Sequence, residues 1–264
     1  KRNVEIIGID NFSSYYDPDL KRKRHKHLIK VSRKSLGTFL MHEIDLLDEN
    51  STRAIIKKFN PNVICHLAAQ AGVRYSLDNP KSYIDNNIVA TTNLLELAKE
   101  FSIDDFILAS TSSVYGLSKS VPFSEETPID STISPYAASK RACELLCHTY
   151  HHIYGTKFRI LRFFTVYGPW GRTDMALFKF TKSILAGNPI DVYNNGDMKR
   201  DFTFIDDIVS GFISAIEKDY DYEIFNLGFG ETVNLESFIE RLEDCLGRKA
   251  QKSYLPMQDG DVPF

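Results

Sequence analysis

FILAS at Phe106–Ser110 is an unbroken, mostly apolar run whose length and composition predict a buried strand. Ser134-Pro135 then supplies an N-cap and a first-turn proline, which predict a helix to about Tyr154. FRILR at 158–162 predicts the next strand. Near-continuous apolar strands separated by helices are typical of a parallel sheet with helices on both faces, so this region predicts an α/β fold.

The same alternation extends toward the N-terminus. Strands are predicted at 4–9, near 39–41 and at 63–67, and helices at 51–59 and from Asn79-Pro80 to about 101. The segment from Asp10 to Lys34 is predicted to be polar and irregular. Its dense charge block at 21–27 is interpreted as a solvated helix face rather than a nucleic-acid or anionic-lipid patch, because nothing aromatic interleaves it.

Regular alternation weakens after Gly168-Pro169, which predicts a second, smaller lobe. Short strands are expected near 191–193 and 202–204, and a last helix is expected between Asn234 and Gly247. The helix predicted at 206–217 returns to the main sheet. We therefore predict one domain made of 1–166 together with 202–218, and a lobe made of 167–201 and 219–264.

Composition restricts the classes of function. With 43% hydrophobic and 25% charged residues in 264, the chain has the average composition of soluble globular proteins. Its 32 basic and 35 acidic side chains lack the basic footprint of a nucleic-acid binder. No apolar stretch approaches the roughly 18 residues of a membrane span. Neither nucleic acid nor membrane is expected as a partner, and a cytoplasmic location is predicted. Four scattered cysteines are predicted to be buried free thiols; a metal or redox pair of Cys143 and Cys147 is the alternative.

Tyr136 and Lys140 lie four residues apart near the start of the helix that opens at Ser134, so both side chains project from one face. An ammonium beside a phenol favours the phenolate and is expected to lower a pKa that is normally about 10. Tyr136 would then be an acid and base near neutral pH. The spacing alone is weak, since Tyr and Lys four apart occur on many exposed helices.

A run of hydroxyls strengthens this interpretation. The strand that ends at Ser110-Thr111-Ser112-Ser113 delivers them to the carboxyl edge of a parallel sheet, where open α/β folds bind ligands. A polar loop capped by its own side chains is the alternative. A hydroxyl next to a Tyr-Lys pair suits oxidation of an alcohol to a ketone, because one group orients the substrate O–H while the phenolate removes its proton.

With these motifs, the chain resembles the extended short-chain dehydrogenase/reductase family, in particular its nucleotide-sugar epimerase branch, and is most similar to UDP-glucuronate 4-epimerases. The matching segments cover nearly the whole chain. They are 66–74 (HLAAQAGVR), 83–87 (YIDNN), 110–116 (STSSVYG), the Tyr136/Lys140 pair, 162–172 (RFFTVYGPWGR) and 199–202 (KRDF).

The resemblance implies a Rossmann-like doubly wound parallel sheet that binds NAD, with the smaller lobe binding the nucleotide sugar. It makes Thr111, Tyr136 and Lys140 the catalytic set. It also implies a cofactor site of Asp10, Asn11, Phe12, Asp45, Leu46, Leu67, Ala68, Ala69, Tyr136 and Lys140. Asp10 would hydrogen-bond the adenosine ribose, and because a carboxylate repels a 2′-phosphate, NAD is expected over NADP.

The resemblance further implies a UDP-sugar substrate and a homodimer. The predicted substrate-binding residues are Ser112, Ser113, Thr165, Arg172 and Arg200, the first four because they lie on loops expected at the carboxyl edge of the sheet. Arg200 resembles the family's diphosphate-binding arginine. Arg172 could clamp a substrate carboxylate bidentately, and the alternative is a surface pair between Arg172 and Asp174.

Ser112 and Ser113 also select a reaction. The related 4,6-dehydratases carry an Asp-Glu pair at these positions and the decarboxylases carry a Glu at the second, so the two serines favour a redox-only 4-epimerisation of UDP-glucuronate to UDP-galacturonate. Another epimerase, a dehydratase or a decarboxylase of the family is the alternative.

One departure concerns the family's glycine-rich phosphate loop, which should precede Asp10 by roughly 20 residues and is not in this sequence. We expect a fragment trimmed at its ends, which would bind NAD poorly and be inactive by itself. A natural loss that leaves a non-catalytic cofactor-binding module is the alternative.

Overall fold

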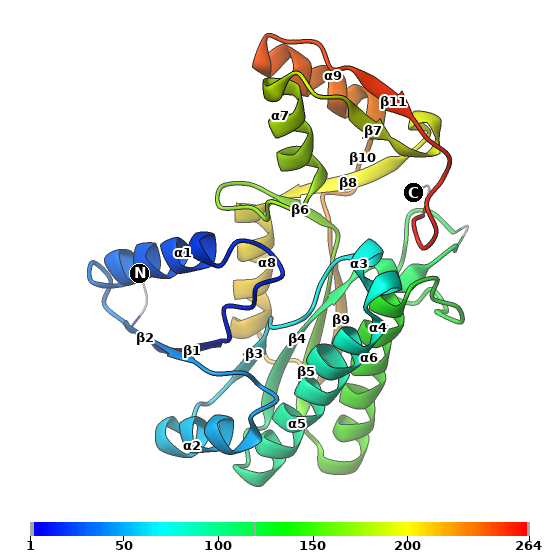
Figure 1. Cartoon of the computed structure of the whole chain (residues 1–264). Coiled ribbons are helices and arrows are strands. Elements are labelled where there is room, and N and C mark those ends of the chain that lie inside the picture. Colours follow the sequence, from blue (N-terminus) through cyan, green and yellow to red (C-terminus); the bar gives the residue numbers. More distant parts are fainter. Residues whose placement is uncertain (1–2, 119, 263–264) are drawn as a thin grey trace.

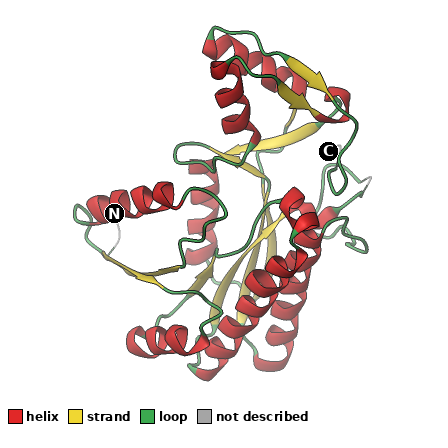
Figure 2. Cartoon of the chain, viewed as in Figure 1, coloured by secondary structure: helices red, strands yellow, loops and turns green. Residues whose placement is uncertain are grey.

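The computed structural model describes residues 3–118 and 120–262, so the extreme ends of the predicted domains lie outside the described residues. Its main sheet is parallel, in the order β3-β4-β5-β9. These strands are β3 (Ile64–His66), β4 (Asp105–Thr111), β5 (Lys157–Phe163) and β9 (Tyr222–Leu227). Helices α5 (Ala90–Glu100) and α6 (Pro135–Tyr154) lie on one side of the sheet and α8 (Ile205–Glu217) on the other (Figures 1 and 2). The predicted α/β fold with a Rossmann-like parallel sheet is confirmed.

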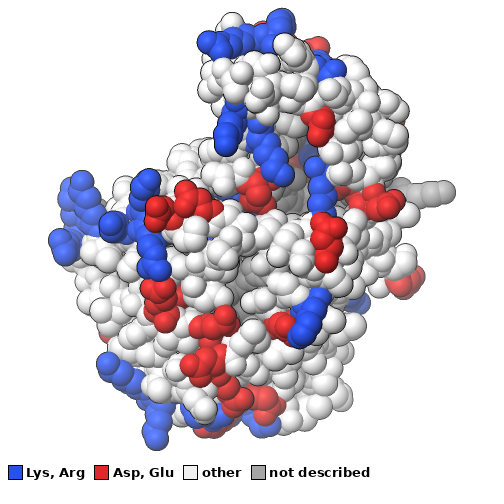
Figure 3. Space-filling view, in the orientation of Figure 1, with Lys and Arg blue, Asp and Glu red and all other residues white. Residues whose placement is uncertain are grey.

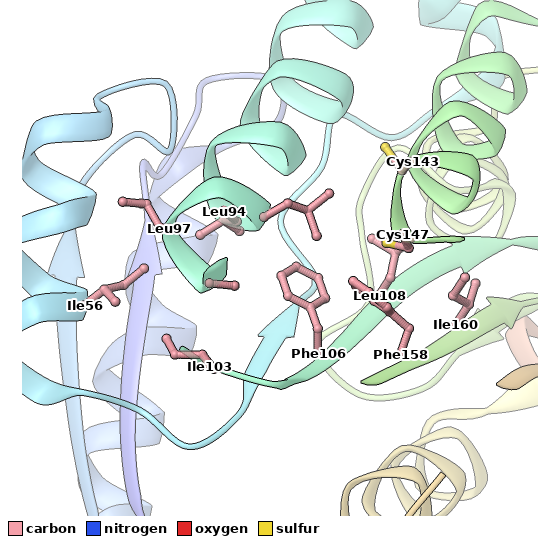
Figure 4. Packing of buried hydrophobic residues seen from close by; sticks show 12 residues of the cluster. Ile56, Leu94, Leu97, Ile103, Phe106, Leu108, Cys143, Cys147, Phe158 and Ile160 are labelled. Atoms are coloured by element: carbon pink, nitrogen blue, oxygen red, sulfur yellow. The ribbon is translucent and has the colours of Figure 1, made fainter. Parts of the chain in front are cut away.

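The core explains why β4 and β5 are mostly apolar, apart from the buried Arg159 and Arg162 of β5 and the polar residues at the ends of β4. Phe106 and Leu108 pack toward α5 and α6, whereas Ile107 between them packs toward α8. Strands buried on both faces cannot alternate polar and apolar residues. Figure 4 shows Cys143 and Cys147 of α6 within this cluster, and both are buried free thiols, as predicted.

Two of the four cysteines differ from the prediction of burial. Cys65 lies on β3, at one edge of the four-stranded sheet, and Cys245 lies in the last helix on the face opposite the buried Ile239 and Glu243. Both are exposed. Apolar neighbours in the sequence therefore did not show on which face of its strand or helix each of these two cysteines lies.

The N-terminal elements form a second parallel sheet of β1 (Glu5–Asp10) and β2 (Thr38–Glu43), with α1 (Pro18–Ser32) between them and α2 (Glu49–Phe59) after them. The prediction of an irregular segment up to Lys34 was wrong, because α1 occupies most of it. Asp17 caps this helix by accepting from the backbone N–H of Asp19, and Pro18 fills the first turn. No residue of α1 is buried, so no apolar periodicity marks it in the sequence.

The single helix predicted from Asn79-Pro80 to about 101 is built in three parts. They are α4 (Pro80–Tyr83), the π-helical turn η1 (Ile84–Val89) and α5, and the short α3 (Val73–Asp78) precedes them. The π turn carries Asn87, whose buried side chain donates to the Gln70 carbonyl and to the Ser139 hydroxyl and accepts from the Gln70 N–H. This side chain ties the loop after β3 to α6.

The second lobe stands at the top of Figure 1. Its strands are β6 (Thr165–Tyr167), β7 (Ile190–Val192), β8 (Lys199–Phe204), β10 (Thr232–Asn234) and β11 (Lys252–Tyr254), and its helices are α7 (Ala176–Ala186) and α9 (Leu235–Leu246). Two 3₁₀ turns, η2 (Ser112–Tyr115) and η3 (Tyr193–Gly196), complete the described elements. Strands β10, β8 and β6 form one sheet and β11 and β7 another. Ile184, Ile190, Val192 and Ile239 form a separate buried cluster.

Two predicted boundaries differ from the structure. The range 202–218 was assigned to the main domain, yet residues 202–204 belong to β8, which pairs with β10 and β6 in a sheet of the second lobe. The range 219–264 was assigned to the lobe, yet β9 within it pairs with β5 in the main sheet. Its sequence, YEIFNL, is neither a continuous apolar run nor a strict alternation of apolar and polar residues, so its length and pattern did not distinguish the two sheets. No helix in residues 3–118 and 120–262 has the length and apolar character needed to cross a membrane.

Candidate active site

A cleft of about 1710 Å³ lies where the strands β1, β2, β3, β4 and β5 end, and it extends to the second lobe. Figure 3 shows acidic and basic side chains interspersed over the face of the molecule that includes the hollow below the lobe. The lining contains every site residue predicted from the sequence, namely Asp10, Asn11, Phe12, Asp45, Leu46, Leu67, Ala68, Ala69, Thr111, Ser112, Ser113, Tyr136, Lys140, Thr165, Arg172 and Arg200. The structure thus brings them to one place, while the role of each stays a prediction.

The fold positions the predicted catalytic set through two element ends. Thr111 is the last residue of β4 and the N-cap of η2, where its hydroxyl accepts from the Ser113 N–H at 3.2 Å and donates to the Ser113 hydroxyl at 3.2 Å. Tyr136 lies in the first turn of α6, which Ser134 caps by accepting from the Ala137 N–H at 3.2 Å. Lys140 follows one turn later and is buried.

The electrostatics of Tyr136 differ from the sequence-based expectation. Burial raises the pKa of Tyr136, and the groups that lower it are the Thr111 hydroxyl and the charge of Arg172 rather than Lys140. Burial likewise lowers the pKa of Lys140, because removal from water disfavours its charged form. The expectation that the ammonium depresses the phenol's pKa was wrong, since it took account of spacing but not of desolvation.

A neutral histidine lies on the inner side of Lys140. His66 is 3% exposed, and burial together with the charge of Lys140 lowers its pKa to about 3. One of its ring nitrogens hydrogen-bonds the Thr91 hydroxyl at 3.0 Å. His66 is therefore uncharged at neutral pH and fills space behind the site without adding a second cation.

A buried ion pair lies directly behind the catalytic set. Glu144, one turn after Lys140, accepts two hydrogen bonds from Arg162 of β5, at 3.0 and 2.9 Å, and one from the Ser110 hydroxyl at 2.6 Å. Although burial alone raises it, the hydrogen bonds and charge of Arg162 leave the pKa of Glu144 below its usual value. The pair connects α6 with the carboxyl ends of β4 and β5.

The predicted cofactor residues at the N-terminal side form a small hydrogen-bonded group. Asp10 ends β1 and accepts from the Phe12 N–H at 2.7 Å, and Phe12 adopts a left-handed backbone with φ of 46°. The Asn11 amide donates to Asp45 at 2.8 Å. Two carboxylates at the ends of adjacent parallel strands suit the hydroxyl groups of a ribose, so these residues fit NAD.

Arg200 reaches the cleft from β8 in the second lobe. Its Nη1 donates to the Lys199 carbonyl at 2.7 Å, and among the described residues no carboxylate forms an ion pair with it. Burial lowers the pKa of Arg200, although the charge of Asp261 opposes this effect. A half-buried guanidinium without an anionic partner in the described chain fits a diphosphate.

Arg172 is paired in the structure. Its Nε donates to Asp174 Oδ1 at 3.0 Å and its Nη2 to Asp174 Oδ2. The alternative of a pair with Asp174 is therefore present, but it lies in the cleft rather than on an exposed surface, since the side chains are only 31% and 20% exposed. Asp174 occupies only the Nε and Nη2 side of the guanidinium, so the other side of Arg172 can still bind a ligand.

Sequence reasoning missed several lining residues. The charge block was predicted to be a solvated helix face, yet Lys21 donates to the Ser13 carbonyl at 2.7 Å and Arg24 to the Gly171 carbonyl at 2.9 Å, and both line the cleft. Their spacing of three residues on one helix face was the available signal. Tyr15 gave no signal, because only the fold brings it to Asp174. Within residues 3–118 and 120–262, no group of His, Cys, Asp and Glu side chains could hold a metal ion.

Comparisons with known proteins place this geometry in a family. An uncharacterised protein of Methanocaldococcus jannaschii is 50% identical over 260 residues, which are 98% of this chain and 78% of that protein. A UDP-glucuronate 4-epimerase of Thermodesulfobacterium geofontis is 43% identical over 99% of this chain and 79% of that enzyme. The crystal structure of a UDP-glucuronic acid 4-epimerase from Bacillus cereus, in complex with UDP-glucuronic acid and NAD, matches with a TM-score of 0.90 at 35% identity, over 98% of this chain and 80% of that chain. The family model for NAD-dependent epimerases and dehydratases matches residues 1–228, and the chain belongs to that family.

Proposed function

We propose that this protein is an NAD-dependent epimerase that interconverts UDP-glucuronate and UDP-galacturonate by transient oxidation at C4. The observation that carries the proposal is the meeting of Thr111, Tyr136, Lys140 and Arg172 in one cleft at the carboxyl edge of the parallel sheet. The relatives named UDP-glucuronate 4-epimerase, at 43% identity and at a TM-score of 0.90, support the choice of reaction.

Different residues of the chain would bind the cofactor, transfer the proton of the C4 hydroxyl and orient its oxygen. The chemistry that bound NAD would supply is reversible transfer of the C4 hydride. Asp10 and Asp45 would hold the adenosine end of NAD, and Lys140 its nicotinamide ribose. Tyr136 removes the proton of the C4 hydroxyl and later returns it to the ketone oxygen, while Thr111 orients that oxygen by a hydrogen bond.

Ser112 and Ser113 favour epimerisation over elimination of water. Elimination from a 4-keto sugar needs an acid for the leaving hydroxyl and a base for the C5 proton. These two positions, directly after the catalytic Thr111, offer hydroxyls but no carboxylate. The ketone then turns within the cleft and is reduced again on its other face rather than losing water.

A glucuronate substrate carries a chemical hazard. Its 4-keto form is a β-keto acid, which loses CO₂ when the bond from C5 to the carboxylate is perpendicular to the carbonyl plane. An epimerase must hold that carboxylate out of this alignment. Arg172 supplies a charged donor, and Ser112, Ser113 and Thr165 supply hydroxyls that line the same cleft.

Chromatography of the sugar nucleotides tests this function on the full-length protein. UDP-glucuronate should be converted to UDP-galacturonate. UDP-glucose should react far more slowly, because its sugar offers no carboxylate to Arg172. The Arg172→Ala variant should bind UDP-glucuronate more weakly and release some UDP-4-keto-pentose. Equal rates on the two substrates would refute the carboxylate site, and absence of any epimerised product would refute the function.

We also propose that the enzyme works as a homodimer in the cytoplasm. Apolar side chains on the outer surface of η1 and α6, among them Ile84, Val89, Leu145 and Ile153, are exposed to solvent in the single chain. Their burial against a second copy would remove apolar surface from water. Sedimentation of the purified protein at micromolar concentration should give twice the mass of one chain; a monomer there would contradict the proposal.

A further inference from the structure

Asp174 lies between Arg172 and Tyr15 in the cleft. Its Oδ1 accepts from Arg172 Nε, and its Oδ2 accepts both from Arg172 Nη2 and from the Tyr15 hydroxyl, the latter at 3.1 Å. Although burial alone raises it, the hydrogen bonds and charge of Arg172 leave the pKa of Asp174 below its usual value, so Asp174 is charged at neutral pH. Three hydrogen bonds therefore fix this carboxylate.

Tyr15 is also held by contacts with Gly72, in the loop after β3, and with Tyr75 of α3. Its ring packs against Tyr75 with centroids 4.9 Å apart, and a Cβ at Gly72 would come within 2.5 Å of its hydroxyl oxygen. Gly72 also has φ of 105°, which side chains rarely tolerate, so only glycine lets Tyr15 approach this closely. Tyr15, on the segment between β1 and α1, thus joins the loop after β3 to the loop after β6.

The pair leaves one side of the guanidinium available. Asp174 takes Nε and Nη2, and within the described chain no hydrogen bond uses Nη1 of Arg172. Two further basic side chains, Lys21 and Arg24, line the same cleft. A second carboxylate can therefore approach Arg172 without displacing the first.

We propose that Asp174, fixed by Tyr15, is a positioning residue that holds Arg172 with its Nη1 side toward the cleft and so sets the preference for a sugar nucleotide that carries a carboxylate. This inference rests on the proposed function for its substrate. It goes beyond that function, because it assigns the substrate preference to Asp174, a carboxylate of the protein that does not touch the substrate. Displacement of Asp174 by the substrate, the opposite arrangement, would break three hydrogen bonds and leave a half-buried charge unpaired.

The two arrangements predict opposite results for Asp174→Asn in the full-length protein. If Asp174 positions Arg172, the KM for UDP-glucuronate should rise by about tenfold or more with a small change in kcat, because the clamp loses its orientation. The KM for UDP-glucose should change by less than about twofold on the same reasoning, since no anion is lost. If Asp174 competes with the substrate, the KM for UDP-glucuronate should instead fall, and the proposal is overturned.

Tyr15→Phe provides a milder variant that keeps the ring and removes only the donor to Asp174. It should raise the KM for UDP-glucuronate about threefold, which corresponds to the lower end of the net contribution of one hydrogen bond. Glu43→Gln is the matched control, because it breaks another bidentate arginine pair, with Arg22, at an exposed site that does not line the cleft. An unchanged KM in both test variants, or an equal loss on both substrates, refutes the positioning role.

Calorimetry separates this inference from the function. The ratio of Kd for UDP-glucuronate to Kd for UDP-glucose is measured for the parent and for Asp174→Asn, with NAD present, whether or not turnover occurs. If the parent does not turn over UDP-glucuronate but the ratio of Kd values shifts in Asp174→Asn, the function is refuted and the positioning role is kept. If the parent turns over UDP-glucuronate but the ratio of Kd values is the same in Asp174→Asn, the function is kept and the positioning role is refuted.

Discussion

Tyr136 is the residue on which the proposed chemistry depends most. Its phenol is the only acid and base that the account uses, so Tyr136→Phe should lower kcat by at least about 10² while NAD affinity changes little. Tyr150→Phe is the matched control, since Tyr150 lies on the same helix and contacts Glu96 on the surface. A Tyr136→Phe enzyme with more than half of the parent kcat would remove Tyr136 from its role.

The raised pKa of Tyr136 gives this residue a pH signature. Because burial moves the phenol's pKa upward, the fraction of phenolate increases about tenfold per pH unit throughout the range below that pKa. The kcat/KM of the parent should therefore rise between pH 7 and pH 9, and the Tyr136→Phe variant should lose this slope. A profile that falls over this range in the parent would contradict the assignment of a basic phenolate.

Residue spacing predicted where the site residues lie but not how they are charged. The four-residue spacing of Tyr136 and Lys140 and the hydroxyl run at Thr111 depend only on helix and strand geometry, which the sequence encodes locally. The direction of the Tyr136 pKa shift and the partner of Arg172 depend on neighbours that the fold brings from far along the chain, such as Tyr15. No local pattern contains that information.

At the scale of elements, the pair Glu144–Arg162 connects α6 to β5. Both side chains are almost fully buried, at 0% and 1% exposure, so Arg162→Met leaves a buried carboxylate short of its main partner. We expect a loss of about 3–5 kcal/mol in the free energy of unfolding. Arg141→Met, which removes the partly exposed second arginine on the same carboxylate, should cost about 1 kcal/mol or less. Denaturant titration measures both values, and equal losses would show that burial does not decide the strength of this pair.

Elements were predictable where burial shaped their sequence. Strands β4 and β5 are mostly apolar because helices cover both faces, and α6 begins at a serine cap followed by proline. Helix α1 was not predicted, because it buries no residue and so lacks an apolar stripe. The π turn in η1 also escaped prediction, since a one-residue change in hydrogen-bond pattern leaves the apolar spacing nearly intact.

At the scale of the whole molecule, the division of labour between the two lobes stays a prediction. The residues assigned to NAD lie at or after the ends of β1, β2 and β3 and in the first turns of α6, whereas Arg200 belongs to a lobe with its own buried cluster. The sequence located the change in architecture near Gly168 from the loss of regular alternation. It did not reveal that β9 returns to the main sheet, because pairing between distant strands leaves no trace in either strand alone.

Two buried aliphatic residues test this division. Ile239 is 0% exposed in the lobe cluster, and Leu97 is 0% exposed in the cluster beside the main sheet. Each change to alanine should cost about 2–5 kcal/mol through the cavity it leaves. If the lobes act separately, Ile239→Ala should raise the KM for the UDP-sugar by about threefold or more, because a less stable lobe is competent for a smaller fraction of the time. The Kd for NAD should stay unchanged in Ile239→Ala and rise in Leu97→Ala. Parallel changes of both constants in both variants would mean that the two clusters unfold as one unit and that the substrate and cofactor sites share a single source of stability.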